Sequence, residues 1–165
     1  MKIFPTNNYE FELTKESTDA LSELAKNTLI TDSLVSEWTK KAFIGQVNNN
    51  SFKIISSKPG RGAFCILNGK LESKRGTLEI RIHKAFRIML SLIYLFPIIG
   101  FTIALFTKEK EVIITLILPT LMALVVFRFV FTELAFRIIS RNGLKKLTEI
   151  IGITKLKKNV AQHCV

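Results

Sequence analysis

Two long apolar runs, separated by a short charged connector, constrain this chain more than any other feature of its sequence. No charged residue occurs between Ile88 and Phe106, and none occurs between Val112 and Phe127. A helix needs roughly 17–25 mostly apolar residues to cross a bilayer. Each run is long enough, and the connector is too short to be a domain. We therefore predict a transmembrane helical hairpin over residues 86–133, with spans at about 86–106 and 112–132.

The rest of the chain is long enough for one small folded domain. We predict an α+β fold, with a small antiparallel sheet and one or two N-terminal helices in residues 1–85. Residues 134–165 are predicted to form a C-terminal basic amphipathic helix and a tail, also in the cytosol. The hairpin then divides the domain in sequence.

The formal net charge of +11 lies outside the outer ends of the two apolar runs. Residues 1–87 carry 14 Lys and Arg against 9 Asp and Glu, and residues 137–165 carry 7 against one. The connector, residues 107–111, is neutral. Because Lys and Arg near membrane spans are enriched on the cytosolic side, this distribution predicts a multi-pass protein with both termini in the cytosol.

The same basic residues are candidates for contact with the membrane surface. Lys and Arg close to an anionic leaflet contribute about 1 kcal/mol each to binding. The candidates are Arg81, Lys84, Arg87, Arg128, Arg137, Arg141, Lys145 and Lys146. The expected partners are the lipid bilayer, with its anionic headgroups, and a protein partner or further copies of the chain. Nucleic acid is not expected, because the sequence lacks the basic–aromatic interleaving that stacks on bases.

The N-terminal segments alternate between strand and helix patterns. Period-two alternation predicts a strand over Asn8–Thr14, and helical spacing of leucines predicts a short amphipathic helix over Ser17–Thr28. The inward face of the strand would hold Tyr9, Phe11 and Leu13. The following segment, Ile30–Lys41, fits either a further helical turn or a loop.

Four more segments predict an antiparallel meander. They cover Ala42–Val47, Ser51–Lys58, Ala63–Leu71 and Thr77–His83. Turns are predicted at Pro59–Gly62 and at Lys74–Gly76. Asn68-Gly69 is either a tight turn or a bulge in one long strand. Because only Lys84–Phe86 separates the last strand from the first span, we expect the sheet to lie close to the cytosolic face of the membrane.

The segment after the second span is amphipathic with a change of phase. One helical face holds Phe131, Leu134, Ala135 and Ile138, and a second face, about half a turn away, holds Leu144, Leu147, Ile150 and Ile151. The change falls near Asn142-Gly143, where a helix would end or kink. We therefore expect the second span to bend there and return a short basic helix, followed by a frayed tail over residues 153–165.

A series of motifs follows Lys41 in order. They are Phe-x-Gly-x-Val at Phe43, Gly45 and Val47, Phe-x-Ile at Phe52 and Ile54, Asn68-Gly69, and Gly76-Thr77, before an alternating strand and the two apolar runs. This order resembles a pattern in small bacterial membrane proteins, Bacteroidota-type among them, that have two membrane helices and a cytosolic antiparallel β domain. The resemblance covers roughly residues 41–150. It implies an architecture and a bacterial inner-membrane location, and it implies no site residues.

No motif for catalysis, a cofactor or a metal stands out. The only histidines, His83 and His163, have no cysteine or carboxylate at ligand spacing. Cys65 has no nucleophile-elbow motif around it. We therefore predict no catalytic, cofactor-binding or metal-binding residue.

The leading functional hypothesis is a non-enzymatic, membrane-anchored binding or scaffolding module. One alternative is an oligomeric pore of toxin or defence type, which a polar stripe along a span would favour. Another is an enzyme acting on lipid at the interface, which a cleft with polar residues around Arg81 and His83 would favour.

Overall fold

A computed structural model describes residues 4–35, 37–58, 62–107 and 110–159. The chain divides into two compact units, each described separately below. One comprises Met1–His83 with Ile138–Val165, and the other is Lys84–Arg137.

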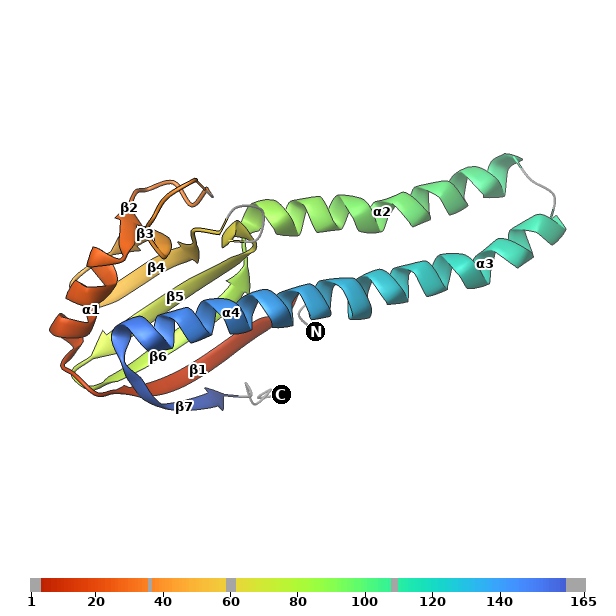
Figure 1. Cartoon of the computed structure of the whole chain (residues 1–165). Helices are drawn as coiled ribbons and strands as arrows, with labels where there is room; N and C mark the ends of the chain where they lie inside the picture. The colour runs from red at the N-terminus through yellow and green to blue at the C-terminus, as the bar shows by residue number, and fades with distance from the viewer. Residues whose placement is uncertain (1–3, 36, 59–61, 108–109, 160–165) are drawn as a thin grey trace. The chain divides into compact units, whose positions relative to one another are not determined.

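The first unit is built on a seven-stranded sheet with strand order β2-β3-β4-β5-β6-β1-β7 (Figure 1). Neighbouring strands are antiparallel except for the pair β2 and β3, which is parallel. The strands are β1 (Thr6–Leu13), β2 (Thr28–Ile30), β3 (Phe43–Val47), β4 (Ser51–Ser56), β5 (Cys65–Glu72), β6 (Arg75–Ile82) and β7 (Ile153–Asn159). Helix α1 (Ser17–Lys26) follows β1, and a single 3-10 turn (Gly62–Phe64) precedes β5. The predicted α+β class with an antiparallel sheet and an N-terminal helix is confirmed.

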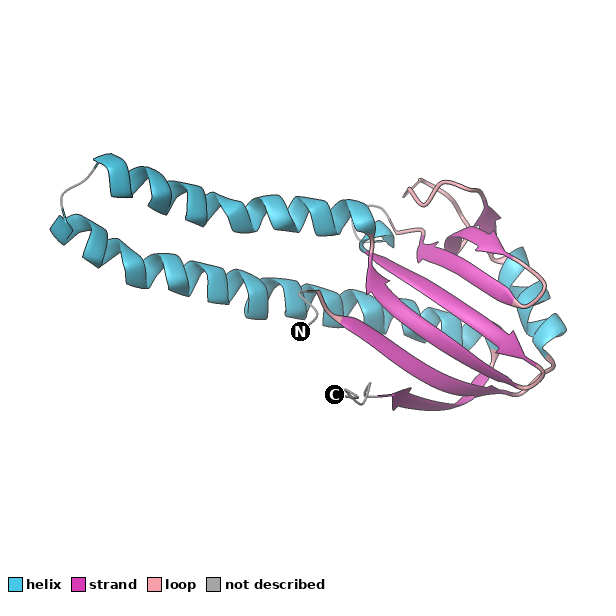
Figure 2. Ribbon diagram, turned by 180° about the vertical axis from the view of Figure 1, so that it is seen from behind, coloured by secondary structure: helices cyan, strands magenta, loops and turns pink. Residues whose placement is uncertain are grey.

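Both helices of this unit cover the same face of the sheet. Figure 2 looks onto the opposite face, and α1 and α4 (Glu133–Ile151) lie behind the strands. Apolar and polar residues alternate along β6. Its apolar residues Leu78, Ile80 and Ile82 lie on the covered face and are almost completely buried. Leu24 of α1 and Leu147 of α4 are also fully buried in this unit. The predicted inward faces of β1 and β6 are therefore confirmed, with Phe11 and Leu13 buried on β1.

Two glycines in this face make room for phenylalanine rings from the neighbouring strands. Gly69 pairs with Phe52, and Gly76 pairs with Phe11. A Cβ atom on either glycine would overlap the partner's ring. Residues 65–72 consequently form one continuous strand through Gly69, without a turn, because the absence of a side chain is what the packing of Phe52 requires. Two alternatives are predicted for Asn68-Gly69, a tight turn or a bulge in one long strand, and the structure has the long strand.

The opposite face is open and mostly polar, apart from a small apolar cluster. Ile44, Ile55 and Ile66 are buried there, and Leu34 from the loop between β2 and β3 packs on them. Ile30–Lys41 therefore contributes the end of β2 and a loop; the alternative of a helical turn is not seen in the described part of this segment.

The second unit contains two helices long and apolar enough to cross a membrane. Helix α2 covers Lys84–Thr107, and α3 (Lys110–Val125) continues through a π-helical segment (Val126–Thr132) into α4. Their apolar side chains are exposed along both helices, unlike those of a core helix in a soluble protein. The hydroxyls of Tyr94 and Thr132 lie 2.6 Å apart and form a hydrogen bond within this unit.

The predicted bend at Asn142-Gly143 is wrong. Residues 113–151 form one uninterrupted helix. Its buried stripe consists of Thr132, Phe136, Ser140, Gly143, Leu147 and Ile151. Of the two predicted apolar faces, the first was therefore misassigned, since Leu134 and Ile138 are 54% and 48% exposed, whereas Leu147 and Ile151 of the second are buried. Sequence patterning missed the stripe because it includes a threonine, a serine and a glycine, which a search for apolar residues passes over.

Two other predictions need correction. Residues 153–159, expected to fray, form β7 and pair with β1 along an antiparallel register. The turn expected at Lys74–Gly76 is instead Ser73-Lys74, with Ser73 at a φ of 54°, so that Arg75 and Gly76 belong to β6. Most of the turn expected at Pro59–Gly62 lies outside the described residues.

Candidate functional site

The chain leaves the sheet where β6 ends, and we call this end of the strands the exit edge. Strand β6 ends at Ile82, the His83 amide donates a hydrogen bond to the Phe64 carbonyl at 2.9 Å, and α2 begins at Lys84. The predicted three-residue linker is thus reduced to one residue. The last row of paired residues that crosses five strands before this end is Ile44, Ile55, Ile66, Arg81 and Thr6.

The chain enters the first unit again at Ile138 of α4. Gly143 of α4 lies against Leu67, in the middle of β5, where an added Cβ would be 3.4 Å from a methyl group. Nine residues later, Gly152 accepts a hydrogen bond of 3.0 Å from the amide of Thr14, just beyond the far end of β1. Because α4 crosses the sheet in this direction, its Ile138 end is directed toward the exit edge.

Three of the predicted lipid-contact residues lie at or directly after the exit edge. Arg81 is half-buried on the open face of β6, two residues before His83. Lys84 and Arg87 are exposed in the first turn of α2. Their position follows from the sequence alone, because a strand that runs directly into an apolar helix must carry its flanking charges at the junction.

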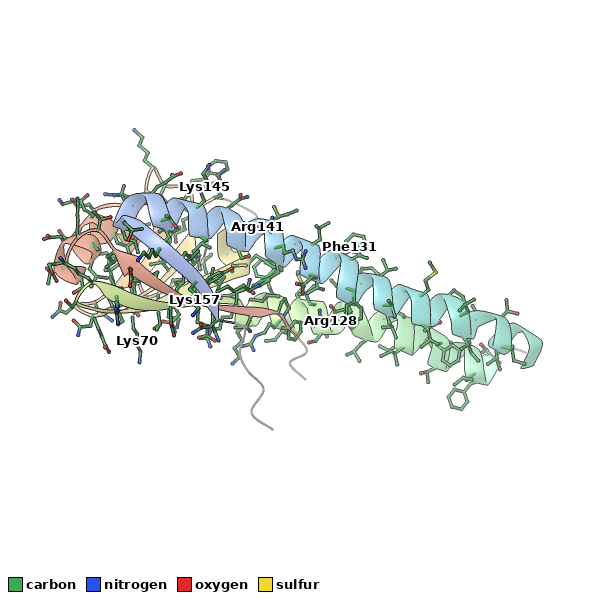
Figure 3. The ribbon with its side chains drawn as sticks, turned by 90° about the horizontal axis from the view of Figure 1, so that it is seen from below. Lys70, Arg128, Phe131, Arg141, Lys145 and Lys157 are labelled. Carbon is green, nitrogen blue, oxygen red and sulfur yellow. The ribbon has the colours of Figure 1, made fainter. Side chains whose placement is uncertain are left out.

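The other five predicted residues follow the long helix. The guanidinium of Arg128, in the π-helical segment, lies over the ring of Phe129 at 5.4 Å, and Arg137 forms an ion pair of 3.7 Å with Glu133. Arg141 and Lys145 are exposed on α4 (Figure 3), and Lys146 beside them is half-buried. At 1.5 Å per residue, Lys145 lies about 12 Å beyond Arg137 along the helix axis. The eight residues thus form two groups, and their contact with lipid stays a prediction.

Burial and charge act in opposite directions on Tyr9, which α4 approaches. Burial raises the pKa of the Tyr9 phenol, and the positive charge of Arg141 lowers it by a smaller amount. Arg141 is therefore near enough to Tyr9 for its charge to act on the phenol.

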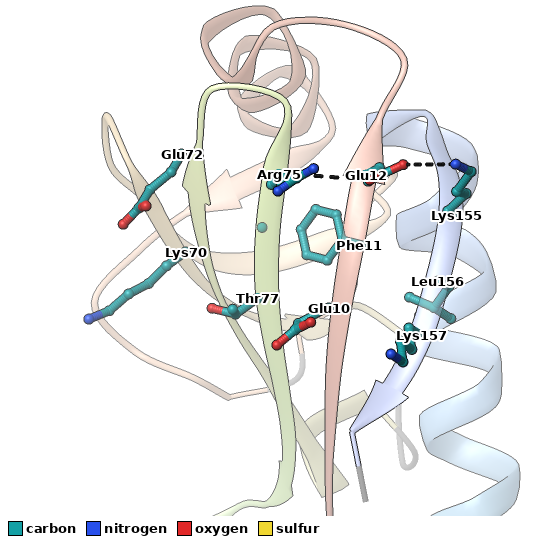
Figure 4. A pocket seen from close by; sticks show the side chains of 11 residues that line it. Glu10, Phe11, Glu12, Lys70, Glu72, Arg75, Thr77, Lys155, Leu156 and Lys157 are labelled. Carbon is teal, nitrogen blue, oxygen red and sulfur yellow. Dashed lines mark ion pairs between the residues drawn. The ribbon is translucent and has the colours of Figure 1, made fainter.

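A groove of about 560 Å³ crosses the open face of the sheet over β5, β6, β1 and β7 (Figure 4). Its lining includes two rows of directly paired residues. One row is Glu72, Arg75, Glu12 and Lys155, and the other is Lys70, Thr77, Glu10 and Lys157. Charge alternates in sign along the first row, so opposite charges face each other across every strand pair, which stabilises the sheet.

Ion pairs occupy part of this groove. Glu12 accepts contacts from Arg75 at 3.7 Å and from Lys155 at 3.4 Å. The side-chain amide of Asn159 donates a hydrogen bond of 2.7 Å to the Glu10 carboxylate. The seven charged residues of the two rows sum to a net charge of +1. Such a surface suits a partner that offers both donors and acceptors better than it suits a highly charged anion.

Cys65 lies at the exit edge with its thiol in the core. The residue is 2% exposed, and burial raises the pKa of the thiol to about 12. A thiol with this pKa is a poor nucleophile at neutral pH, because the thiolate is the reactive form. Within the described parts of the chain, no three His, Cys, Asp or Glu side chains lie close enough together to hold a metal ion.

The groove was missed in the sequence because three of its eleven lining residues belong to β7. The lysines of β7 have the sequence pattern of a frayed tail. The pairing of β7 with β1, as between Glu10 and Lys157, leaves no signal in the neighbouring sequence. One clue was present: an edge strand with several lysines is a common way to prevent pairing with other chains. The sequence Ile-Thr-Lys-Leu-Lys-Lys-Asn fits that description.

Comparison of the chain with protein-family models, with curated proteins and with solved structures finds no match.

Proposed function

We propose that this chain is a multi-pass protein of a bacterial inner membrane, with both termini and the α+β domain in the cytosol. The exposed apolar surfaces of α2 and α3 support insertion in a bilayer. The excess of Lys and Arg on either side of the hairpin supports this orientation, with the connector outside. The role that we propose for the protein rests on the surface that the domain offers.

That role is a non-enzymatic binding or scaffolding module held at the membrane. The observation that carries the proposal is the groove on the open sheet face, because α1 and α4 cover only the other face. Its alternating charges fit a polar protein surface. Arg81, Lys84 and Arg87 at the exit edge, with the basic residues of the long helix, are suited to anionic headgroups.

Orientation is tested by labelling with a membrane-impermeant maleimide in spheroplasts. In a Cys164→Ser background, Thr107→Cys is expected to react in intact spheroplasts, and Lys157→Cys only after lysis. Both side chains are exposed, so neither result depends on burial. Reaction of Lys157→Cys before lysis would place the domain outside and refute the orientation.

The binding role is tested with a photocrosslinking amino acid in native membranes. Thr77 is exposed in the groove, and Ser22 is exposed on α1 and serves as a matched control. A discrete protein adduct is expected from position 77 and not from position 22. Adducts only between copies of the chain, together with conductance in liposomes, would replace the binding module by an oligomeric pore.

A further inference from the structure

The loop between β2 and β3 exposes an aromatic side chain that the functions above do not use. Trp38, the only tryptophan of the chain, is 91% exposed, and Val35 is 59% exposed. Among the described residues of the sheet unit, no large apolar side chain is more exposed than Trp38. Because burial of apolar side chains is favourable, an exposed tryptophan beside an exposed valine is a candidate contact surface.

This loop is fastened to the sheet at several points. Leu34 packs on the cluster of Ile44, Ile55 and Ile66. Gln46 donates a hydrogen bond of 2.6 Å to Asp32, and the Ser57 hydroxyl donates to the carbonyl of Lys41. With both ends held, Val35 and Trp38 are presented by a positioned loop.

Two of the three fastening points lie at the exit edge, and the third, the hydrogen bond between Gln46 and Asp32, lies two residues further along β3. The cluster under Leu34 belongs to the same row of cross-strand partners as Arg81, which is three residues before the start of α2. Ser57, which holds the other end of the loop, follows β4 at this same end. Three strand spacings separate β3 from β6, which amounts to about 14 Å. A chain that enters a bilayer at Lys84 therefore keeps the loop within a short distance of the headgroups.

Charge around the loop fits an anionic surface. Lys58 is exposed directly after Ser57, which holds the loop, and Arg81 lies in the same row of the sheet as the cluster under Leu34. Within the loop, Asp32 is bonded to Gln46 and the exposed Glu37 is offset by Lys40. Tryptophan is enriched at membrane–water interfaces, where its apolar ring and its N–H group are both satisfied.

We propose that this loop is a second membrane attachment, with Trp38 and Val35 seated in the headgroup region of an anionic bilayer. The proposal rests on the membrane anchoring proposed above and adds a docking surface to it. Attachment at the loop as well as at the two helices would fix the sheet's orientation and determine which way the groove faces.

Fluorescence of the full chain in lipid nanodiscs whose scaffold protein lacks tryptophan tests the proposal, since all tryptophan emission then comes from Trp38. With acyl-brominated lipid in anionic nanodiscs, the emission is expected to shift to shorter wavelength and to lose intensity. The loss is expected to be smaller in purely zwitterionic nanodiscs, and equal losses would refute the electrostatic part of the proposal.

A matched variant, Trp38→Phe with Thr18→Trp, moves the probe to an exposed site on α1. Thr18 lies near the opposite end of the sheet, because neighbouring Glu16 contacts Ser73 in the β5–β6 turn. This variant is expected to show no quenching. If Trp38 itself stays unquenched while the chain resists carbonate extraction, the loop proposal fails and the anchoring stands. If the chain is extracted, the anchoring fails.

Discussion

Replacing Gly143 by alanine tests whether α4 is a continuous helix packed on the sheet. A glycine that ended the helix would adopt a left-handed conformation, which costs a residue with a side chain about 1–2 kcal/mol. Among the described glycines, only Gly45 and Gly152 have a positive φ, so Gly143 is an interior helical residue. Alanine in a helix interior is more stable than glycine by about 1 kcal/mol.

Packing does not reverse this sign. The new methyl group would lie 3.4 Å and 3.7 Å from the two end methyls of Leu67, which is close to ordinary van der Waals contact with a flexible side chain. We therefore expect Gly143→Ala to raise the free energy of unfolding by about 1 kcal/mol. Gly152→Ala, at the residue directly after the same helix, is the matched control. Its φ is +71°, and an added Cβ would meet Thr14 at ordinary contact distances of 3.5 and 3.8 Å, so the backbone strain alone should destabilise the domain by about 1–2 kcal/mol.

The assay uses Cys65, whose thiol becomes reactive when the domain unfolds. The thiol is pulse-labelled across a urea titration in mild detergent, in a Cys164→Ser background. The labelled fraction reports the unfolding of the domain separately from that of the apolar helices. With a slope of about 1–3 kcal/mol per molar urea, the midpoint should rise by about 0.3–1 M for Gly143→Ala. It should fall for Gly152→Ala. A midpoint that falls for Gly143→Ala by a similar amount would refute the continuous helix and favour the bend expected from the sequence.

Two further predictions concern the sheet. Gly69→Ala should lower the free energy of unfolding by about 1–3 kcal/mol, because its Cβ would overlap the Phe52 ring, and adding Phe52→Leu should recover part of the loss in the same urea assay. The raised pKa of Cys65 makes the folded state hold a proton that the unfolded state releases, so its contribution to stability is complete below about pH 9 and falls as the pH rises toward 12. Urea midpoints followed by circular dichroism between pH 8 and 10.5 should decline more steeply for the native chain than for Cys65→Ala, and parallel declines would contradict the burial of the thiol.

Local patterns determined a large part of this protein. A strand with one buried face has a period of two, so the inward residues of β1 and β6 could be read directly from the sequence. An apolar run of sufficient length is equally local, which is why the positions of α2 and α3 were predictable. The charges at the start of α2 were predictable for the same reason, since they adjoin the run in sequence.

Only the tertiary structure decided the features that depend on distant partners. Strand β7 is stabilised by pairing with β1, whose Leu13 precedes Ile153 by 140 residues, and without that pairing its lysines show the pattern of a tail. Gly69 and Gly143 both suggested breaks, yet each lies inside a continuous element because a side chain from another strand or from the sheet occupies the space beside it. The groove and the exposure of Trp38 likewise depend on how segments distant in sequence pack together. A sequence specifies the period of each element, and the packing of elements against one another specifies which surface is left open.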